Sequence, residues 1–388
     1  MSRSPQKKIR ILSILIAILA VADILVISAC FRVPGKKARV PATEPTEIQD
    51  ETTEPEPTDP EAPVSTATVL ATGDLLMHKK VIDSGKQEDG SYDFSSIFRY
   101  ISPIVQQADY AVANLETTLA GTDNGYAYSG NPKFNSPDAI VDAAKDAGFQ
   151  MLLTANNHSL DTGLVGFKRT VQVVREKGLE TLGTYLTADE KKWTVVNVNG
   201  INLGMVCYTY SDGFNQSGKP VLNFVNELSE DGLLNYFTYD HLPEFYEELG
   251  TYVKEMKAAG ADATILFIHW GTEYRLSADT NQTAMAQALC DLGIDAIVGG
   301  HPHVVEPMDL LTSSQDPSHK TVALYSLGNA VSNQRKEEIE SRPTGETEDG
   351  LLYRLTFGKY ADGTVKIDAV DLIPTWVNMN SDSGSRLY

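Results

Sequence analysis

Seven short apolar runs, several of them separated by helix-like segments, constrain the fold most strongly. Each run has the length and composition of a β-strand or a pair of strands, and they cover 67–73, 110–116, 150–156, 194–210, 263–271, 296–300 and 321–329. Three intervening segments show a helical pattern and end at glycine, as helix C-termini prefer: 136–148, 166–178 and 283–293. Strands alternating with helices predict an α/β fold.

Two features refine this prediction at particular places. The segment 136–148 starts with Ser136 as an expected cap and Pro137 in the first turn. The tail 350–373 has the pattern of a hairpin that turns at 361–363. The sequence shows no internal repeat.

Polar side chains able to bind metal ions follow most of these runs. In open α/β sheets, ligands bind outside the carboxyl ends of the strands. Five of the seven histidines lie at such ends. The polar residues concerned are Asp74, His78, Asn114, Glu116, Asn156, Asn157, His158, Asp161, His269, Glu273, His301 and His303. The pattern predicts a metal site at the edge of the sheet.

The segment AIVGGHPHVVEP (296–307) places His301 and His303 on either side of a proline. Side chains alternate along extended chain, so both imidazoles can converge on one point. A polar loop whose histidines bond nearby carbonyls is the alternative interpretation.

In chain order, the motifs GD, NLE, NNHSLDxG, HWGxEY, GHPHV and YSLGN resemble the CapA family of poly-γ-glutamate capsule biosynthesis proteins. The domain of that family resembles the calcineurin-like metallophosphoesterases. The resemblance spans roughly residues 67–330. It implies an α/β sandwich of two β-sheets flanked by helices, with a two-metal centre at its edge.

The resemblance also implies a role for each motif residue. Asp74 and His303 would bind one divalent ion, and Asn157, His269 and His301 the other, with Glu116 as the bridge. His158 would donate a proton or stabilise developing charge. Imidazole mixed with carboxylate and amide oxygen suits ions of the Mn, Fe or Zn type.

The neighbouring residues have supporting roles or structural alternatives. Asp74 has a second interpretation as a strand-end turn residue. Asn157 and His158 have an alternative interpretation as caps of the following helix. We assign that capping role to Asp161 and Gly163 instead. We expect Glu273 to orient His269, and Trp270 to form a wall of the pocket. His78 is open between a pocket role and simple solvent exposure. Asn114, Asn156 and Asn329 are also expected around the pocket.

The sequence departs from related patterns at several positions. Three residues separate Asp74 from His78, where typical phosphoesterases have Asp-x-His. Glu116 stands where those enzymes have Gly-Asp-x-x-Asp. Ala330 replaces a phenylalanine after YSLGN, and Glu306 stands where glutamine is common in the family. The last two changes concern the rim of the site.

The N-terminal part has the composition of a membrane tether. Residues 11–29 are almost continuously apolar and long enough to cross a bilayer, and Cys30 follows as in a lipoprotein signal. We therefore predict a single-pass or lipid anchor at 1–33. A disordered, acidic, Pro- and Thr-rich linker then covers 34–65. A domain at 66–375 held outside the cytoplasm at the cell membrane follows, with a tail at 376–388.

Charge limits the partners of the domain. From residue 66 onward, 24 basic residues stand against 43 acidic ones. Nucleic acid is excluded as a partner because phosphate binding needs clustered Lys and Arg. A polyglutamate chain is itself an anion, so we expect its contact to be confined to the site, or capsule synthetase and export proteins to carry it.

Three functions fit the sequence. The first is a membrane-anchored protein supporting poly-γ-glutamate capsule synthesis or export. The second is a metal-dependent phosphoesterase or other hydrolase of the cell envelope, unrelated to capsule. The third is a non-catalytic metal-binding module. The complete set of histidine ligands favours a hydrolase-type site over the third function.

Overall fold

The computed structural model describes residues 62–224, 226–342, 344–380 and 386–387. Contacts divide the chain into Met1–Thr58 and Asp59–Tyr388, and all described residues lie in the second unit. The predicted membrane span at 11–29 and nearly all of the acidic linker lie outside the described residues. Among the described residues, no helix is long and apolar enough to span a bilayer.

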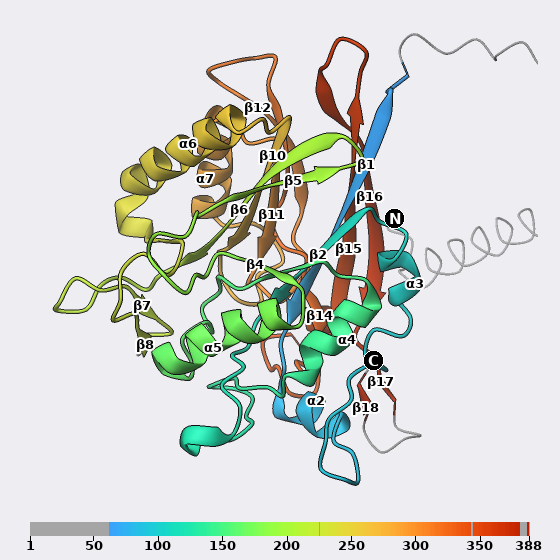
Figure 1. Ribbon diagram of the computed structural model, residues 1–388, viewed down its shortest axis with the longest axis vertical. Helices are drawn as coiled ribbons and strands as arrows, with labels where there is room; N and C mark the ends of the chain where they lie inside the picture. Colours follow the sequence, from blue (N-terminus) through green and yellow to red (C-terminus); the bar gives the residue numbers. More distant parts are fainter. Residues whose placement is uncertain (1–61, 225, 343, 381–385, 388) are drawn as a thin grey trace, which may run out of the picture. The chain divides into compact units, whose positions relative to one another are not determined.

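Two β-sheets form the centre of the described unit (Figure 1). The first sheet has the order β16 (Val365–Trp376), β15 (Asp349–Lys359), β1 (Ser65–Leu75), β2 (Tyr110–Leu115), β3 (Met151–Leu153) and β4 (Glu180–Leu182), with β14 (Asn329–Val331) also on β1. The second has the order β12 (Met308–Thr312), β13 (Lys320–Leu324), β11 (Ala296–Gly300), β10 (Ala263–His269), β6 (Ile201–Tyr210) and β5 (Thr194–Val198), with β9 (Tyr236–Phe237) also on β6. Two short pairs stand apart: β7 (Val221–Leu222) with β8 (Asn226–Glu227), and β17 (Met379–Asn380) with β18 (Arg386–Leu387).

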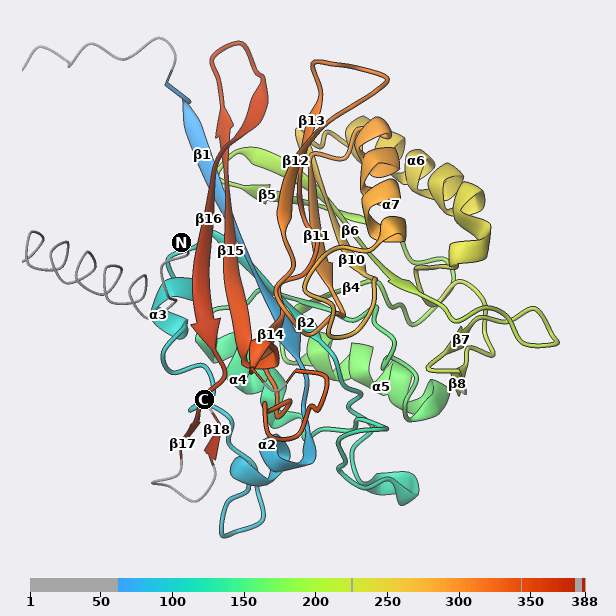
Figure 2. The same ribbon diagram turned by 180° about the vertical axis from the view of Figure 1, so that it is seen from behind.

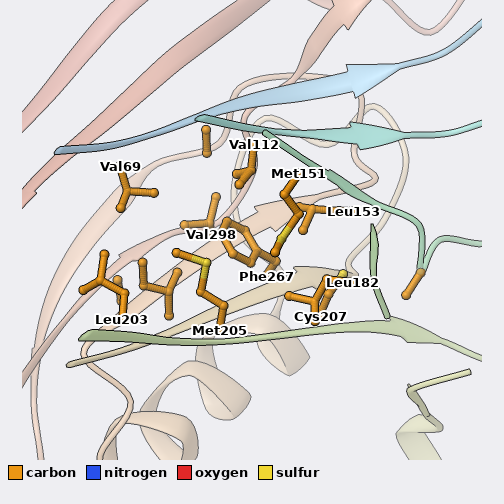
Figure 3. Close-up of a cluster of buried hydrophobic side chains, with 14 of the residues drawn as sticks. Val69, Val112, Met151, Leu153, Leu182, Leu203, Met205, Cys207, Phe267 and Val298 are labelled. Carbon is orange, nitrogen blue, oxygen red and sulfur yellow. The ribbon is translucent and has the colours of Figure 1, made fainter. Parts of the chain in front are cut away.

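The two sheets face each other across a core of apolar side chains. Figure 3 shows Val69 and Val112 from the first sheet pointing toward Met205 and Phe267 of the second. Side chains alternate along each strand, so Leu70 points to the opposite side and joins a separate cluster beneath helices. This period of two decides which side chains can reach a site between the sheets.

Helices cover the outer faces of both sheets (Figures 1 and 2). On the first sheet, the outer core includes side chains from α2 (Lys79–Ser84), α3 (Ser102–Val105) and α4 (Ala139–Ala147). On the second, it includes side chains from α6 (Leu242–Ala258) and α7 (Thr280–Asp291). The helix α5 (Gly163–Glu176) lies beside β4. Short 3-10 turns occupy Asp123–Gly125, Tyr239–His241 and Glu346–Glu348. The predicted two-sheet α/β architecture flanked by helices is confirmed.

Two of the predicted strands are each divided in the structure. The run 194–210 forms the hairpin β5–β6, because Asn199 and Gly200 both adopt positive φ angles, 51° and 84°, at its turn. The run 321–329 is shared between sheets: β13 belongs to the second and β14 to the first. The predicted hairpin in the tail is confirmed as β15–β16.

The helix predictions need smaller corrections. The helix expected from Ser136 begins at Ala139, and Ser136 bonds the Thr117 hydroxyl instead of capping. The long helix α6 was not predicted, although its buried residues follow a helical spacing: Phe245, Leu249, Val253 and Met256.

Candidate metal centre

A bulge in β1 turns Asp74 toward the second sheet. The pairing of β1 with β2 shifts by one residue between Thr72 and Asp74, so Asp74 lies opposite Asn114. In a strand that kept regular alternation through Gly73, Asp74 would point to the outer side with Leu70 and Thr72. A Cβ at position 73 would lie 1.9 Å from the Gly328 backbone oxygen, so this bulge requires glycine.

The histidines come from the ends of β10 and β11 in the opposite sheet. His269 ends β10 on the same side as Ile265 and Phe267, and therefore faces the first sheet. His301 and His303 follow β11 with positive φ angles of 98° and 56°. Non-glycine residues held in this region cost free energy, and such strain concentrates at functional sites.

Five buried side chains from the two sheets form two overlapping groups with metal-ligand geometry. One group is Glu116, His269 and His301, and the other is Asp74, Glu116 and His303. Within each group, the candidate ligand atoms lie within 4.8 Å of one another. Glu116 Oε1 lies 3.5 Å from His269 Nε2 and 3.8 Å from His303 Nε2. Glu116 therefore occupies the shared position that the resemblance implies for a bridging carboxylate.

Two buried atoms in these groups lack hydrogen bonds within the described part of the chain. They are Glu116 Oε1 and His301 Nδ1. A buried carboxylate oxygen without a partner is costly, and a bound cation would remove that cost. Gly300 leaves room beside Asp74, since a Cβ there would lie 3.1 Å from Asp74 Oδ1. The residues present fit divalent metal ions.

Charge in the cluster also suits a cation. Burial opposes ionisation of Asp74, but the hydrogen bond and charge of His303 lower its pKa below the usual value. Burial and then the neighbouring His269 lower the pKa of His301 far below its ordinary value, which leaves the neutral imidazole that coordinates metals. Although burial opposes charge on His303, Glu116 and Asp74 raise its pKa to about 9. The carboxylates of Glu116 and Asp74 thus favour positive charge at His303.

Asn157 and His158 follow β3 and point to different partners. Asn157 Oδ1 lies 2.9 Å from His269 Nε2, at the edge of the first group. His158 Nδ1 lies 2.7 Å from Asp161 Oδ2, which also accepts a hydrogen bond from the Phe134 amide. Burial works against the protonated ring, but Asp161 raises the pKa of His158 above its usual value. Nδ1 is thereby occupied, and Nε2 is the ring nitrogen available to a substrate.

The predicted capping role of Asp161 and Gly163 is wrong. The helix α5 begins at Gly163 after Thr162, and no side chain caps it. The Asp161 carboxylate instead orients His158.

A cleft of about 340 Å³ opens at this point, and His158, His303 and Asn157 line it. His78 lines it as well, so this residue is not merely solvent-exposed. The Asn333 amide donates to His78 Nδ1 over 3.1 Å, and burial lowers the pKa of His78 to about 4. His78 is therefore a neutral ring at physiological pH.

Three asparagines that were expected around the pocket make hydrogen bonds to side chains of the cluster or to one another. Asn114 donates to Asp74 Oδ1 over 2.7 Å, and Asn156 donates to Asn114 Oδ1 over 3.1 Å. Asn329 Oδ1 lies 3.1 Å from His303 Nδ1. Two of these asparagines contact the candidate ligands Asp74 and His303 directly. Hydrogen-bond partners of metal-binding side chains orient them and affect metal affinity.

Two predictions about the HWGxEY motif need correction. Trp270 is fully buried on the outer face of the second sheet, where its Nε1 donates to the Tyr325 carbonyl. It cannot form a pocket wall, because it alternates with the inward-facing His269. Glu273 lines the cleft beside Tyr274, whereas the described polar partners of His269 are Asn157 and Glu116.

Several cleft residues were not predicted from the sequence. Tyr274 and Gln334 bond each other at the rim, and Asn223 reaches the cleft from the hairpin β7–β8. Asn223 lies in a stretch with neither a strand nor a helix pattern, so no local signal marked it. The positive φ of Tyr274, 63°, is likewise visible only in the structure.

Comparison with protein families agrees with this geometry. Residues 68–334 match the family described as "Bacterial capsule synthesis protein PGA_cap". This region contains every residue of the two metal-ligand groups. The chain belongs to this family.

Two family relatives come from Bacillus. The capsule biosynthesis protein CapA of Bacillus anthracis is 30% identical over 270 residues, which cover 69% of this chain and 60% of the relative. The PGA biosynthesis protein CapA of Bacillus subtilis strain 168 is 29% identical over 302 residues, covering 77% of this chain and 70% of the relative. The match with the first relative thus spans less than two thirds of its length.

Among solved structures, a Staphylococcus aureus protein described as a candidate 5'-nucleotidase, in complex with alpha-ketoglutarate, is also similar. Its sequence is 16% identical, and the TM-score is 0.48 over 82% of this chain and 57% of that protein.

Proposed function

We propose that this family member is a metal-dependent hydrolase that supports synthesis or export of a poly-γ-glutamate capsule from the outer side of the cell membrane. The observation that carries the hydrolytic part is Glu116, shared by two buried ligand groups that adjoin a cleft. Its two Bacillus relatives are named for capsule and PGA biosynthesis, which supports the pathway. The apolar stretch at 11–29 supports the membrane tether.

The ligand set supports two ions of the Mn, Fe or Zn type, held by Asp74, Glu116 and His303 on one side and by Glu116, His269, His301 and Asn157 on the other. Such a pair supplies an activated water and neutralises charge on an ester or amide undergoing cleavage. The side chains of Asp74 and Glu116 are fully buried, which would limit the access of bulk water to the ions that they hold.

His158 would supply the proton. Asp161 holds its ring through Nδ1 and raises the pKa of His158 above its usual value, which favours the protonated ring. Nε2 is then free to protonate a leaving oxygen or nitrogen in the cleft. Metal binding and proton donation thus rest on the adjacent residues Asn157 and His158.

The acidic surface limits how a polyglutamate chain would approach. We propose that the polymer contacts the protein only at the cleft, where Lys133 and bound ions offset the surrounding negative charge. Capsule synthetase or export proteins in the membrane would present it there.

The test compares His158→Ala with His241→Ala, which removes an exposed histidine that lines a different cavity. Elemental analysis should find about two ions in wild type and in both variants. Turnover of an aryl phosphodiester and of a γ-glutamyl peptide should fall about 10²–10⁴-fold only in His158→Ala. Capsule yield in producing cells should fall with it.

Wild-type protein that holds both ions but cleaves none of these esters or amides would refute the hydrolase. Normal capsule yield with His158→Ala would separate the centre from capsule synthesis and leave it a metal-binding role.

A further inference from the structure

The hairpin β7–β8 reaches the metal centre from a distant part of the chain. Asn223, which directly follows β7, accepts a hydrogen bond from Asn157 Nδ2 over 2.9 Å. Asn226, which begins β8, donates to Asp161 Oδ1 over 3.3 Å. Two side chains of one hairpin therefore contact the Asn157 amide, next to the ligand groups, and the Asp161 carboxylate that bonds His158.

The contact with Asn157 decides which end of its amide faces the ligand groups. Only the amide oxygen can bind a metal ion, since the amide nitrogen has no lone pair to offer. Asn157 Oδ1 lies 2.9 Å from His269 Nε2, while Nδ2 points to Asn223 Oδ1. Rotating the Asn157 amide by half a turn would bring its oxygen against the oxygen of Asn223. The acceptor of Asn223 thus disfavours the orientation that cannot ligate.

Asn223 also packs against the proton donor. Its Nδ2 lies 3.1 Å from His158 Nδ1, but the single proton on that nitrogen goes to Asp161 at 2.7 Å. The Asn223–His158 contact is therefore packing rather than a second hydrogen bond. The firm bond of Asn223 is the one that it accepts from Asn157.

A turn role alone is the competing explanation. Asn223 has a φ of 49°, and asparagine tolerates this left-handed region better than most residues. Phe224 has a φ of 59° with an exposed side chain, so the turn accepts residues with no preference for that region. The backbone therefore does not by itself require asparagine at 223.

We propose that Asn223 is a positioning residue of the metal centre, which fixes the Asn157 amide with its oxygen toward the ion that His269 and His301 bind. The inference rests on the proposed two-ion centre. It makes the hairpin β7–β8 part of the site, although no chemistry-bearing motif marks it in the sequence.

The experiment uses Asn223→Gly and Asn223→Asp in the full chain, with calorimetric titration of Mn²⁺. Glycine adopts the same backbone angle without strain, so a turn role predicts unchanged affinity and unchanged or higher stability. A positioning role predicts that one of the two ions binds about 10–100-fold more weakly. Asn223→Asp keeps an oxygen acceptor for Asn157, so its affinity should equal or exceed that of wild type.

Visible absorption of the Co²⁺-loaded protein provides a second measurement, because it reports the coordination of the ion. The spectrum should change in Asn223→Gly and be restored in Asn223→Asp. Phe224→Ala, at the same turn, should match wild type in both measurements. Equal Mn²⁺ affinity and equal Co²⁺ spectra for wild type and Asn223→Gly would overturn the proposal while leaving the hydrolase intact. Absence of ion binding by wild type would overturn both.

Discussion

Two buried glutamates each leave one carboxylate oxygen without a hydrogen bond within the described part of the chain, yet their surroundings differ. Glu116 Oε1 lies among His269, His303 and the other ligand side chains. Glu306 belongs to no such group of ligand side chains among the described residues, and Gln282, Asp279 and Arg275 are the neighbours that act on its pKa. An unpaired buried oxygen therefore indicates a metal site only where further ligand side chains converge on it.

Glu306 meets the cost of burial in another way. Burial raises its pKa to about 7, although the hydrogen bond from Gln282 acts in the opposite direction. Near neutral pH, protonation therefore removes the buried charge of Glu306, whereas a bound cation would neutralise the charge of Glu116.

The largest expected effect comes from Glu116→Ala. Removing the carboxylate shared by both groups would take a ligand from each proposed ion, so we expect both ions to be lost. The loss should exceed the roughly 10–100-fold that removal of a supporting partner costs. Elemental analysis and Mn²⁺ calorimetry measure it, with Glu306→Gln as the matched control that keeps both ions. Equal ion content in the two variants would show that Glu116 is no more important for metal binding than Glu306.

A smaller effect separates the two ligand groups. His301 belongs to one group and His303 to the other, so each alanine variant should lose one ion and keep the second. Calorimetry should find about one high-affinity ion in place of two. Loss of both ions in His301→Ala would contradict two separable positions.

Gly73→Ala tests the bulge that aims Asp74. The new methyl group would meet the Gly328 oxygen at 1.9 Å, so backbone must move. We expect a loss of about 1–3 kcal/mol in the free energy of unfolding, together with weaker metal binding. Urea denaturation measures the first quantity.

The matched control for the bulge is Gly250→Ala within α6, where the nearest atom would lie at an ordinary 3.4 Å. Alanine there should stabilise the helix by about 0.5–1 kcal/mol. A Gly73→Ala variant as stable as wild type would show that the bulge does not depend on glycine.

The smallest expected effect is a change in the pH dependence of stability that depends on Glu306. Its folded pKa of about 7 exceeds the unfolded value, so the native state holds the extra proton and stability falls as pH rises from about 4.5 to 7. Glu306→Gln removes this loss. The variant should gain up to about 2 kcal/mol over wild type at pH 8, and little at pH 4.5.

Thermal or urea unfolding at the two pH values checks this prediction. Glu340→Gln, at an exposed position, should show no comparable change with pH. A constant difference between Glu306→Gln and wild type across the range would mean that Glu306 stays ionised in the folded protein.

Part of the site could be predicted because strand alternation is a local property. His269 ends a buried apolar run, and it shares a side with Ile265 and Phe267, four and two positions before it. The same rule places the next residue, Trp270, on the opposite side, in the outer core. Asp74 is different, since the bulge at Gly73 reverses the side that simple alternation assigns to it.

The sequence by itself determined the α/β class, the chemistry of the ligands and their positions at strand ends, because these depend on residue type and on short-range periodicity. Only the tertiary structure decided that two sheets face each other so that Glu116 meets histidines from both β10 and the segment after β11. It also decided that Asn223, 66 residues from Asn157, holds that amide. Such contacts depend on how distant segments pack, and no local pattern of side chains records that packing.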